Sequence, residues 1–273
     1  MEFAVNYLLP EATLFLKLSN TYIKYPGLKW DLETLKELIA SRSKIILHGL
    51  IPSSGSIIDP HLCDHIEEFS KFVKITNQKW LSFHFDYKPK YMCTDFDETI
   101  KRNICKIREY CGENIQILIE NVPPVNNVQD WCMEPVIISN YCEKYDFGFV
   151  LDIPHAFITS KSRGETFDEY VKKLPLGRVK EIHVSGWTEL SDGRLHDSHT
   201  ICKHNVYKLL ESVLYLTPNC EMISIEYSPQ TEFANLSNME KIEEYKYICI
   251  KQQLQLSRVK SIVKKMNDRL LNI

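Results

Sequence analysis

Residues 147–155 read Phe-Gly-Phe-Val-Leu-Asp-Ile-Pro-His, an apolar run that ends in an acid and a histidine. A short and nearly continuous apolar run is typical of a strand that is covered on both faces, as in a parallel sheet. Asp152 and His155 come where this run stops. The stretch therefore predicts a buried parallel strand, Phe147–Ile153, with ligand-type side chains at its carboxyl end.

Similar runs recur along the chain, and helix-like stretches separate them. The eight predicted strands are Phe3–Leu8, Tyr22–Tyr25, Ile45–Leu50, Trp80–Asp86, Gln116–Val122, Phe147–Ile153, Val179–Ser185 and Met222–Ser228. The amphipathic helix candidates are Asp31–Ala40, His61–Thr76, Asp95–Cys111, Met133–Tyr145, Phe167–Lys173 and Lys203–Leu216. This alternation predicts an α/β protein, a single closed (β/α)8 TIM barrel. An open doubly wound sheet would bring a glycine-rich loop after the first strand, and residues 7–10, Tyr-Leu-Leu-Pro, are not one.

We predict one domain over residues 1–273, with the barrel over about 1–235 and a C-terminal helical segment over about 236–273. Apolar residues in this segment recur in steps of three and four, as on one stripe of a long helix, at Leu256, Val259, Val263, Met266, Leu270 and Ile273. Residues 251–273 carry six Lys or Arg and one Asp. This basic helix is interpreted as a closing barrel helix with a solvated face, or as a docking surface for an acidic peptide or partner protein.

The composition is that of a globular protein, with 44% hydrophobic and 25% charged residues. A net charge of −3 provides no broad basic face, so nucleic acid is not an expected partner. Nine cysteines without a C-x-x-C pair indicate reduced, mostly buried thiols. The N-terminus lacks the features of a signal peptide, and no apolar run approaches the ~20 residues of a membrane helix. We therefore expect a cytoplasmic protein that does not enter a membrane.

Histidines and acids interrupt the apolar runs near the carboxyl ends of six consecutive predicted strands, where barrel enzymes place their active sites. These residues are His48, His84, Glu120, Asp152, His155, His183, Asp197, His199 and Glu226, with Asp197 and His199 in the loop after their strand. A single histidine in a strand is more often a hydrogen-bonded core residue than a ligand. Six strands that deliver such residues to the same rim favour a shared site.

Four of these residues, Glu120, Asp152, Asp197 and Glu226, are acids that would converge within roughly 5 Å of one another. At an effective dielectric constant near 20, each like-charge pair costs about 3 kcal/mol, and the six pairs together on the order of 20 kcal/mol. No Lys or Arg lies in the strand-end motifs to offset this. Either the acids take up protons or metal cations lie among them, and the five histidines favour cations. Mixed His and carboxylate ligands suit iron, zinc or manganese.

The order His, His, Glu, Asp-x-x-His, His, Asp-x-His, Glu resembles the trinuclear site of the endonuclease IV/xylose isomerase-like TIM-barrel superfamily. The resemblance spans residues 45–228. It implies that one metal position takes His48, His84 and Glu120; a second takes Glu120, Asp152, His183 and Glu226; and a third takes His155, Asp197 and His199. Under this resemblance we assign the catalytic role to Glu120, Asp152 and His183.

Residues 174–187, Leu-Pro-Leu-Gly-Arg-Val-Lys-Glu-Ile-His-Val-Ser-Gly-Trp, look like a strand of the multinuclear non-heme iron-dependent oxidases of the methanobactin-biosynthesis type. Ile119-Glu120-Asn121 and Asp197-Ser198-His199 fit them as well. This resemblance implies two or three iron ions in mixed valence, and O2-dependent oxidation of cysteine residues in a ribosomally made precursor peptide. It also implies a partner protein that presents the peptide. The chain differs from many relatives in having His155 where they carry Asn.

Other classes stay open on the sequence. A zinc-dependent, endonuclease IV-like phosphodiesterase acting on abasic DNA would use its metals to activate water. The net charge of −3 offers such an enzyme little basic surface. A metal-dependent sugar isomerase or epimerase would use one divalent metal and would not need Asp197 and His199. A metal-dependent binding scaffold without catalysis is the last alternative.

Overall fold

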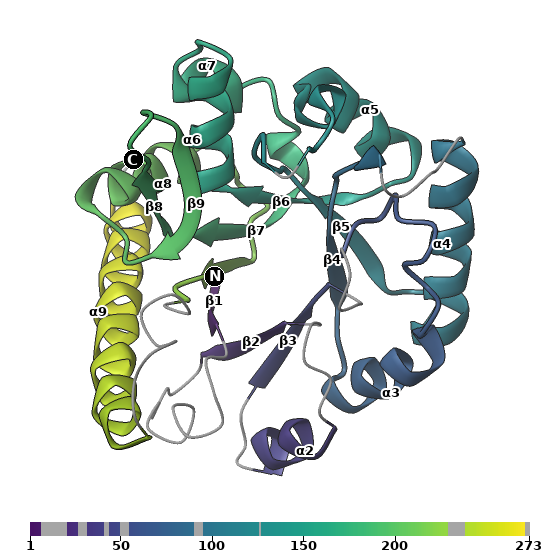
Figure 1. The fold of residues 1–273 in the computed structure, drawn as a ribbon, viewed down its shortest axis with the longest axis horizontal. Helices are drawn as coiled ribbons and strands as arrows, with labels where there is room; N and C mark the ends of the chain where they lie inside the picture. The colour runs from purple at the N-terminus through teal and green to yellow at the C-terminus, as the bar shows by residue number, and fades with distance from the viewer. Residues whose placement is uncertain are drawn as a thin grey trace.

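The computed structural model describes residues 1–6, 21–26, 32–40, 44–49, 55–89, 95–125, 127–228 and 238–270. Eight parallel strands close into a barrel in the order β1-β10-β7-β6-β5-β4-β3-β2 (Figure 1). They are β1 (Glu2–Asn6), β2 (Tyr22–Pro26), β3 (Lys44–His48), β4 (Trp80–His84), β5 (Gln116–Glu120), β6 (Gly148–Asp152), β7 (Val179–Val184) and β10 (Met222–Ile225). The predicted TIM barrel is confirmed. Tyr7, Leu8 and Leu50, at the ends of two predicted strands, lie outside the described residues.

Helices surround the barrel (Figure 1). Those that match the predicted ones, with shorter bounds, are α2 (Leu32–Ala40), α3 (Ile66–Thr76), α4 (Phe96–Cys111), α5 (Pro135–Lys144), α7 (Phe167–Val171) and α8 (His204–Leu214). The 3-10 turns η2 (Asp130–Met133) and η3 (Leu176–Arg178) precede α5 and β7. Of the eight cysteines that the structure describes, all are free and six are buried, as predicted. Cys93 lies outside the described residues.

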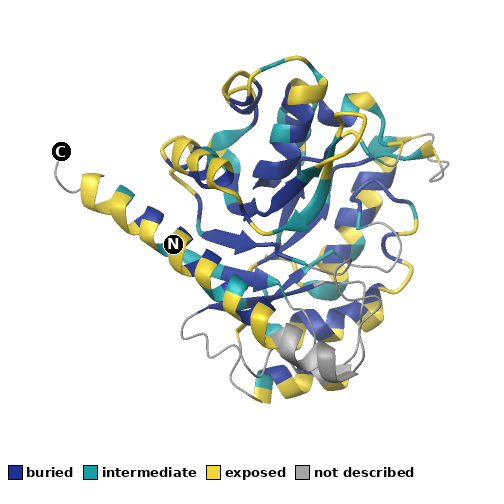
Figure 2. Cartoon of the chain, turned by 60° about the vertical axis from the view of Figure 1, so that its left-hand side comes forward, coloured by how far each residue is buried: buried dark blue, intermediate teal, exposed yellow. Residues whose placement is uncertain are grey.

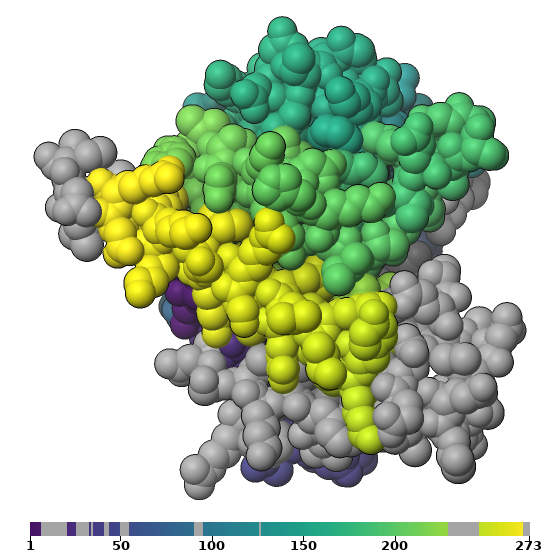
Figure 3. Space-filling model, turned by 90° about the vertical axis from the view of Figure 1, so that its left-hand side faces the viewer, coloured from purple at the N-terminus to yellow at the C-terminus, as the bar shows by residue number. Residues whose placement is uncertain are grey.

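The C-terminal segment forms one long helix, α9 (Asn238–Leu270), which packs against β1, β10 and α8. Figure 3 shows it lying across one side of the molecule. Leu256, Val259 and Val263 of the predicted stripe are buried, while basic residues of the same helix face solvent. Buried and exposed residues alternate along the helix in Figure 2. This packing agrees with the closing-helix interpretation. The side chain of Leu270 and all of Ile273 lie outside the described residues.

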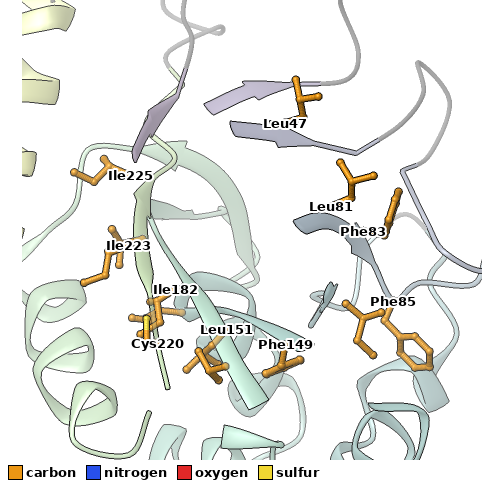
Figure 4. Close-up of a cluster of buried hydrophobic side chains, with 14 of the residues drawn as sticks. Leu47, Leu81, Phe83, Phe85, Phe149, Leu151, Ile182, Cys220, Ile223 and Ile225 are labelled. Carbon is orange, nitrogen blue, oxygen red and sulfur yellow. The ribbon is translucent and has the colours of Figure 1, made fainter. Parts of the chain in front are cut away.

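The predicted ligands point into the barrel because alternate residues of a strand share a face. Glu120 shares its face with Leu118, and Asp152 shares its face with Val150, two members of a small buried cluster inside the barrel. The intervening residues point the other way, toward the helices. Figure 4 shows Leu151 and Ile182 on this outer side. Apolar packing on the outer face thus fixes the direction of the polar side chains on the inner face.

A helix and a hairpin near the candidate site were not predicted. Helix α6 (Ile153–Ser162) begins directly after β6, with Asp152 as its N-cap and a proline in its first turn. An antiparallel hairpin, β8 (Gly186–Glu189) and β9 (Leu195–Thr200), follows β7. The prediction that Asp197 and His199 lie in a loop is therefore wrong, because pairing with β8 makes them part of a strand. The hairpin lies beside α6 in Figure 1.

Candidate metal centre

The barrel brings seven of the nine predicted residues into three overlapping groups of metal-ligand atoms. Within each group, the ligand atoms lie within 4.8 Å of one another. The first group is His48, His84 and Glu120, the second is Glu120, Asp152 and His155, and the third is Asp152, His183 and Glu226. Glu120 and Asp152 each belong to two groups. These two carboxylates are therefore the residues best placed to bridge neighbouring metal positions.

Glu120 lies at the centre of the cluster and is 1% exposed. Its Oε1 lies 3.3 Å from His155 Nδ1, 3.4 Å from His183 Nδ1 and 3.9 Å from His84 Nε2. Its Oε2 lies 3.7 Å from His48 Nε2. Four imidazoles thus surround one buried carboxylate, an arrangement in which a metal on each side would share Glu120.

His183, at the end of β7, faces the carboxylates of two neighbouring strands. Its Nδ1 lies 3.6 Å from Asp152 Oδ2 and 3.5 Å from Glu226 Oε1. All three side chains are buried. The geometry brings together the residues that the family resemblance places at the second position.

Asp197 and His199 enter the cluster from the hairpin, opposite the start of α6. Asp197 Oδ2 lies 3.1 Å from His155 Nε2 and 3.1 Å from His199 Nε2. His155 Nδ1 lies 2.9 Å from the carbonyl oxygen of Asn121, which can only accept, so Nδ1 carries a hydrogen. Nε2, beside Asp197, is therefore the nitrogen that could bind a metal once its proton is displaced. This assigns His155 to the group of Asp197 and His199, although Nδ1 is also close to Glu120. His199 has φ +46°, a strained backbone of the kind found at functional sites.

Neighbouring polar groups hold the backbone of Asp152 and the side chain of His48 in place. The Asn121 amide donates to Asp152 O and accepts from Asp152 N, both at 2.9 Å, which ties the ends of β5 and β6 together. His48 Nδ1 lies 2.7 Å from Ser82 Oγ, which leaves Nε2 directed at Glu120. Such contacts commonly orient metal-binding residues in proteins.

Several buried atoms of the cluster have no hydrogen-bond partner within the described part of the chain, which tests whether metal would fit. They are Glu120 Oε2, Asp152 Oδ2, His183 Nδ1, Asp197 Oδ1 and His199 Nδ1. A buried polar atom without a partner costs about 1–3 kcal/mol, and more when it is charged. Lone pairs on oxygen and nitrogen that converge in this way fit a metal cation, and we find that the residues present match a multinuclear site.

In the metal-free protein the cluster holds protons. Burial lowers the pKa of His155 and of His183, but the carboxylates beside each outweigh burial and raise both pKa values well above the ordinary value. Despite burial, Asp197 raises the pKa of His199 to about 9. Burial also raises the pKa of Asp152. His48 is the exception, because burial and a nearby lysine lower its pKa to about 3.

These pKa directions predict that metal affinity rises with pH. Imidazoles with raised pKa values are protonated at neutral pH, and a metal must displace those protons. His199, with a pKa of about 9, is one of these imidazoles. We expect the Kd for Co²⁺ to fall on the order of tenfold per pH unit for each proton displaced, from about pH 6 to 9. Calorimetric titration in two buffers of different ionisation enthalpy measures the protons released, and a pH-independent Kd would contradict the prediction.

Sequence reasoning missed two buried charged residues beneath the cluster, Lys24 and Glu181. Lys24 Nζ lies 2.8 Å from Glu226 Oε1 and 3.1 Å from Glu181 Oε1. Burial works to lower the pKa of Lys24, yet the surrounding carboxylates raise it above its ordinary value, so the ammonium stays charged. The charge argument from sequence omitted this cation. One signal was available, because Lys24 is a charged residue in the middle of an otherwise apolar strand.

The closed barrel and the histidine and carboxylate cluster at its carboxyl end define a xylose isomerase-like TIM barrel. Its fold is similar to that of a D-tagatose 3-epimerase-like protein, with a TM-score of 0.62 and 17% identity over 96% of this chain and 100% of that chain. It is also similar to endonuclease IV from Thermus thermophilus, with a TM-score of 0.56 and 11% identity over 97% of this chain and 100% of that chain. At these identities the likeness concerns the fold alone.

Residues 13–245 match the family described as RiPP precursor modification enzyme MbnB/TglH/ChrH, where RiPP denotes a ribosomally synthesised and post-translationally modified peptide. The chain belongs to this family, which confirms the resemblance found in the sequence. It is 26% identical over 179 residues to a UPF0276 protein of Acaryochloris marina, covering 60% of this chain and 62% of the relative. A UPF0276 protein of Rhizobium meliloti is 26% identical over 191 residues, covering 63% and 60%. The chain thus spans about three fifths of these relatives.

Among the described residues, none of the helices is both long and apolar enough to cross a membrane.

Proposed function

We propose that this protein is a multinuclear iron, O2-dependent oxidase that modifies cysteine residues of a ribosomally synthesised precursor peptide. One observation carries the proposal: in a chain of the RiPP precursor modification family, buried ligand atoms without partners converge on Glu120, which belongs to two groups. The cysteine-containing peptide, O2 and a peptide-presenting partner protein complete the proposed reaction system.

The proposed metal positions follow the contacts of the side chains. His48 and His84 with Glu120 would hold the first metal; Glu120 with Asp152, His183 and Glu226 the second; and His155 with Asp197 and His199 the third. Nitrogen and oxygen donors without a thiolate suit iron, with zinc or manganese as alternatives. When bound, iron supplies electron transfer to O2 and lowers the pKa of the substrate thiol, so that no separate base is required.

Exposure suggests from which side a substrate arrives. The side chains of His84 and His199 are each 35% exposed, whereas those of Glu120 and Asp152 are 1% exposed. The deep carboxylates would therefore hold the cations and exclude water, while the two exposed imidazoles border the open edge. Substrate cysteine would approach between β4 and the hairpin, where His84 and His199 lie.

Elemental analysis of protein purified without oxygen tests the metal part of this proposal. We expect two to three iron atoms per chain. Stoichiometric zinc, with iron absent even after anaerobic iron supply, would contradict the oxidase and favour phosphodiester hydrolysis.

Mass spectrometry tests the chemistry. The iron-loaded protein would be incubated with O2 and any small cysteine-containing peptide encoded beside its gene, together with any partner protein encoded there. We expect a mass change that requires iron and O2 and that disappears when the peptide's cysteines are replaced by serine. A change that persists in the serine peptide would exclude cysteine as the target, and an unchanged cysteine peptide would contradict the proposed reaction.

A further inference from the structure

Directly beneath the cluster, one buried carboxylate connects four barrel strands. Glu181 on β7 accepts hydrogen bonds from Lys24 Nζ on β2 at 3.1 Å and from Trp80 Nε1 on β4 at 3.2 Å. It also accepts one from Ser224 Oγ on β10. All four side chains are 3% exposed or less. Glu181 therefore has a fixed position, because donors from three other strands hold both of its oxygens.

This network touches the cluster at His183. Glu181 Oε1 lies 3.0 Å from His183 Nε2, and Lys24 Nζ is in close contact with the same nitrogen. Nε2 thus faces an acceptor, Glu181, and a donor, the Lys24 ammonium. When a metal occupies Nδ1, the ring hydrogen lies on Nε2 and is donated to Glu181, because a carboxylate can only accept. A metal that displaces the proton from His183 Nδ1, on the opposite side of the ring, then meets a lone pair directed toward Glu120 and Asp152.

We propose that Glu181 is a positioning residue of the metal centre and that Lys24 is its buried counter-ion. Glu181 fixes the tautomer and the ring orientation of His183, so that Nδ1 faces the metal position. Lys24 keeps a negative charge on Glu181 at no cost in unpaired charge, and it also holds Glu226 Oε1 at 2.8 Å. This inference rests on the metal centre proposed above, and it concerns a residue that belongs to none of the three ligand groups.

A purely structural role for Glu181 and Lys24 makes a different prediction. If Glu181 only stabilised the barrel, its replacement would lower the stability of the metal-free protein and leave the metal affinity of the folded protein unchanged. If Glu181 positions His183, affinity depends on a hydrogen-bond acceptor at this place. Contacts of this kind typically contribute about 10- to 100-fold to metal affinity.

The test compares Glu181→Leu with Glu181→Gln by titrating metal-free protein with Co²⁺ and recording its visible absorption. We expect Glu181→Leu to bind Co²⁺ about 10- to 100-fold more weakly with an altered spectrum. The amide oxygen of Glu181→Gln still accepts from His183, so this variant should stay within a few-fold of the unmodified protein. Glu221→Leu is the matched control, because Glu221 pairs with Lys180 at 2.8 Å on the outer side of β7.

The titration distinguishes failure of the positioning role of Glu181 from failure of the metal centre. Equal affinities and spectra for the Leu and Gln variants would overturn the positioning role. Failure of the unmodified protein to bind Co²⁺ would instead overturn the metal centre on which the inference rests. If Glu181→Leu does not fold, nitrogen NMR of ¹⁵N-histidine-labelled, Zn²⁺-loaded protein gives a second test. A hydrogen on His183 Nε2 with metal on Nδ1 is the expected tautomer, and the reverse assignment would refute the proposal.

Discussion

Glu120→Ala is expected to reduce the iron content from two or three atoms per chain to at most one, and to reduce activity by at least about 100-fold. Glu120 is shared by two of the three ligand groups, and its two oxygens face four histidines. Removing the carboxylate deprives two metal positions of an anionic ligand at once. It also leaves the surrounding imidazoles without the negative charge that opposes their mutual repulsion. Elemental analysis of anaerobically purified protein measures the loss.

Glu113→Ala provides the control, because Glu113 is an exposed acid in the turn before the same strand, β5. It should retain the full iron content. Full iron in Glu120→Ala as well would mean that no metal bridges at this residue, and the assignment of the first two positions would fail.

Asp152 allows metal binding to be separated from folding, because it has two roles. Its carboxylate belongs to two ligand groups, and its Oδ1 accepts from the backbone N of His155 at 2.6 Å as the N-cap of α6. Asp152→Asn keeps the capping oxygen and removes the charge, while Asp152→Ala removes both. We expect either variant to lose metal from the second position and activity by about 100-fold.

The stabilities of the two metal-free variants should differ in a defined direction. Loss of the cap costs about 1 kcal/mol, so Asp152→Ala should unfold at a lower temperature than Asp152→Asn. Asp152→Asn should be at least as stable as the metal-free unmodified protein, since burial raises the pKa of this acid and thus disfavours its charged form. Thermal unfolding after metal removal measures both. A metal-loaded Asp152→Asn protein would show that Asp152 is only a helix cap.

The barrel and its inward-facing ligands could be predicted because both follow from local pattern. Apolar runs such as Phe147–Ile153 give buried strands, and the period of two sends Glu120 and Asp152 to the inner face together. The stretch at residues 174–187 also indicated the family, and residues 13–245 match it.

The remaining features depend on contacts between distant parts of the chain. Residues of β9 are mostly polar and show no apolar alternation, so only their pairing with β8 reveals a strand. Close packing there requires Gly186, because a Cβ at this position would lie 2.3 Å from the carbonyl oxygen of Ile201. Lys24 and its partner Glu181 lie 157 residues apart, and no local pattern connects them. The buried cation therefore became apparent only when the barrel closed.

The hairpin makes part of the proposed metal cluster separable from the barrel. Asp197 and His199 lie on β9, outside the closed barrel. Six of the other predicted ligands lie on barrel strands or at their ends, and His155 lies in the first turn of α6. An insertion or deletion between β7 and α8 changes the number of metal-binding groups without altering a single barrel strand. Under the proposed assignment, such a change would add or remove two of the three ligands of the third metal position, Asp197 and His199.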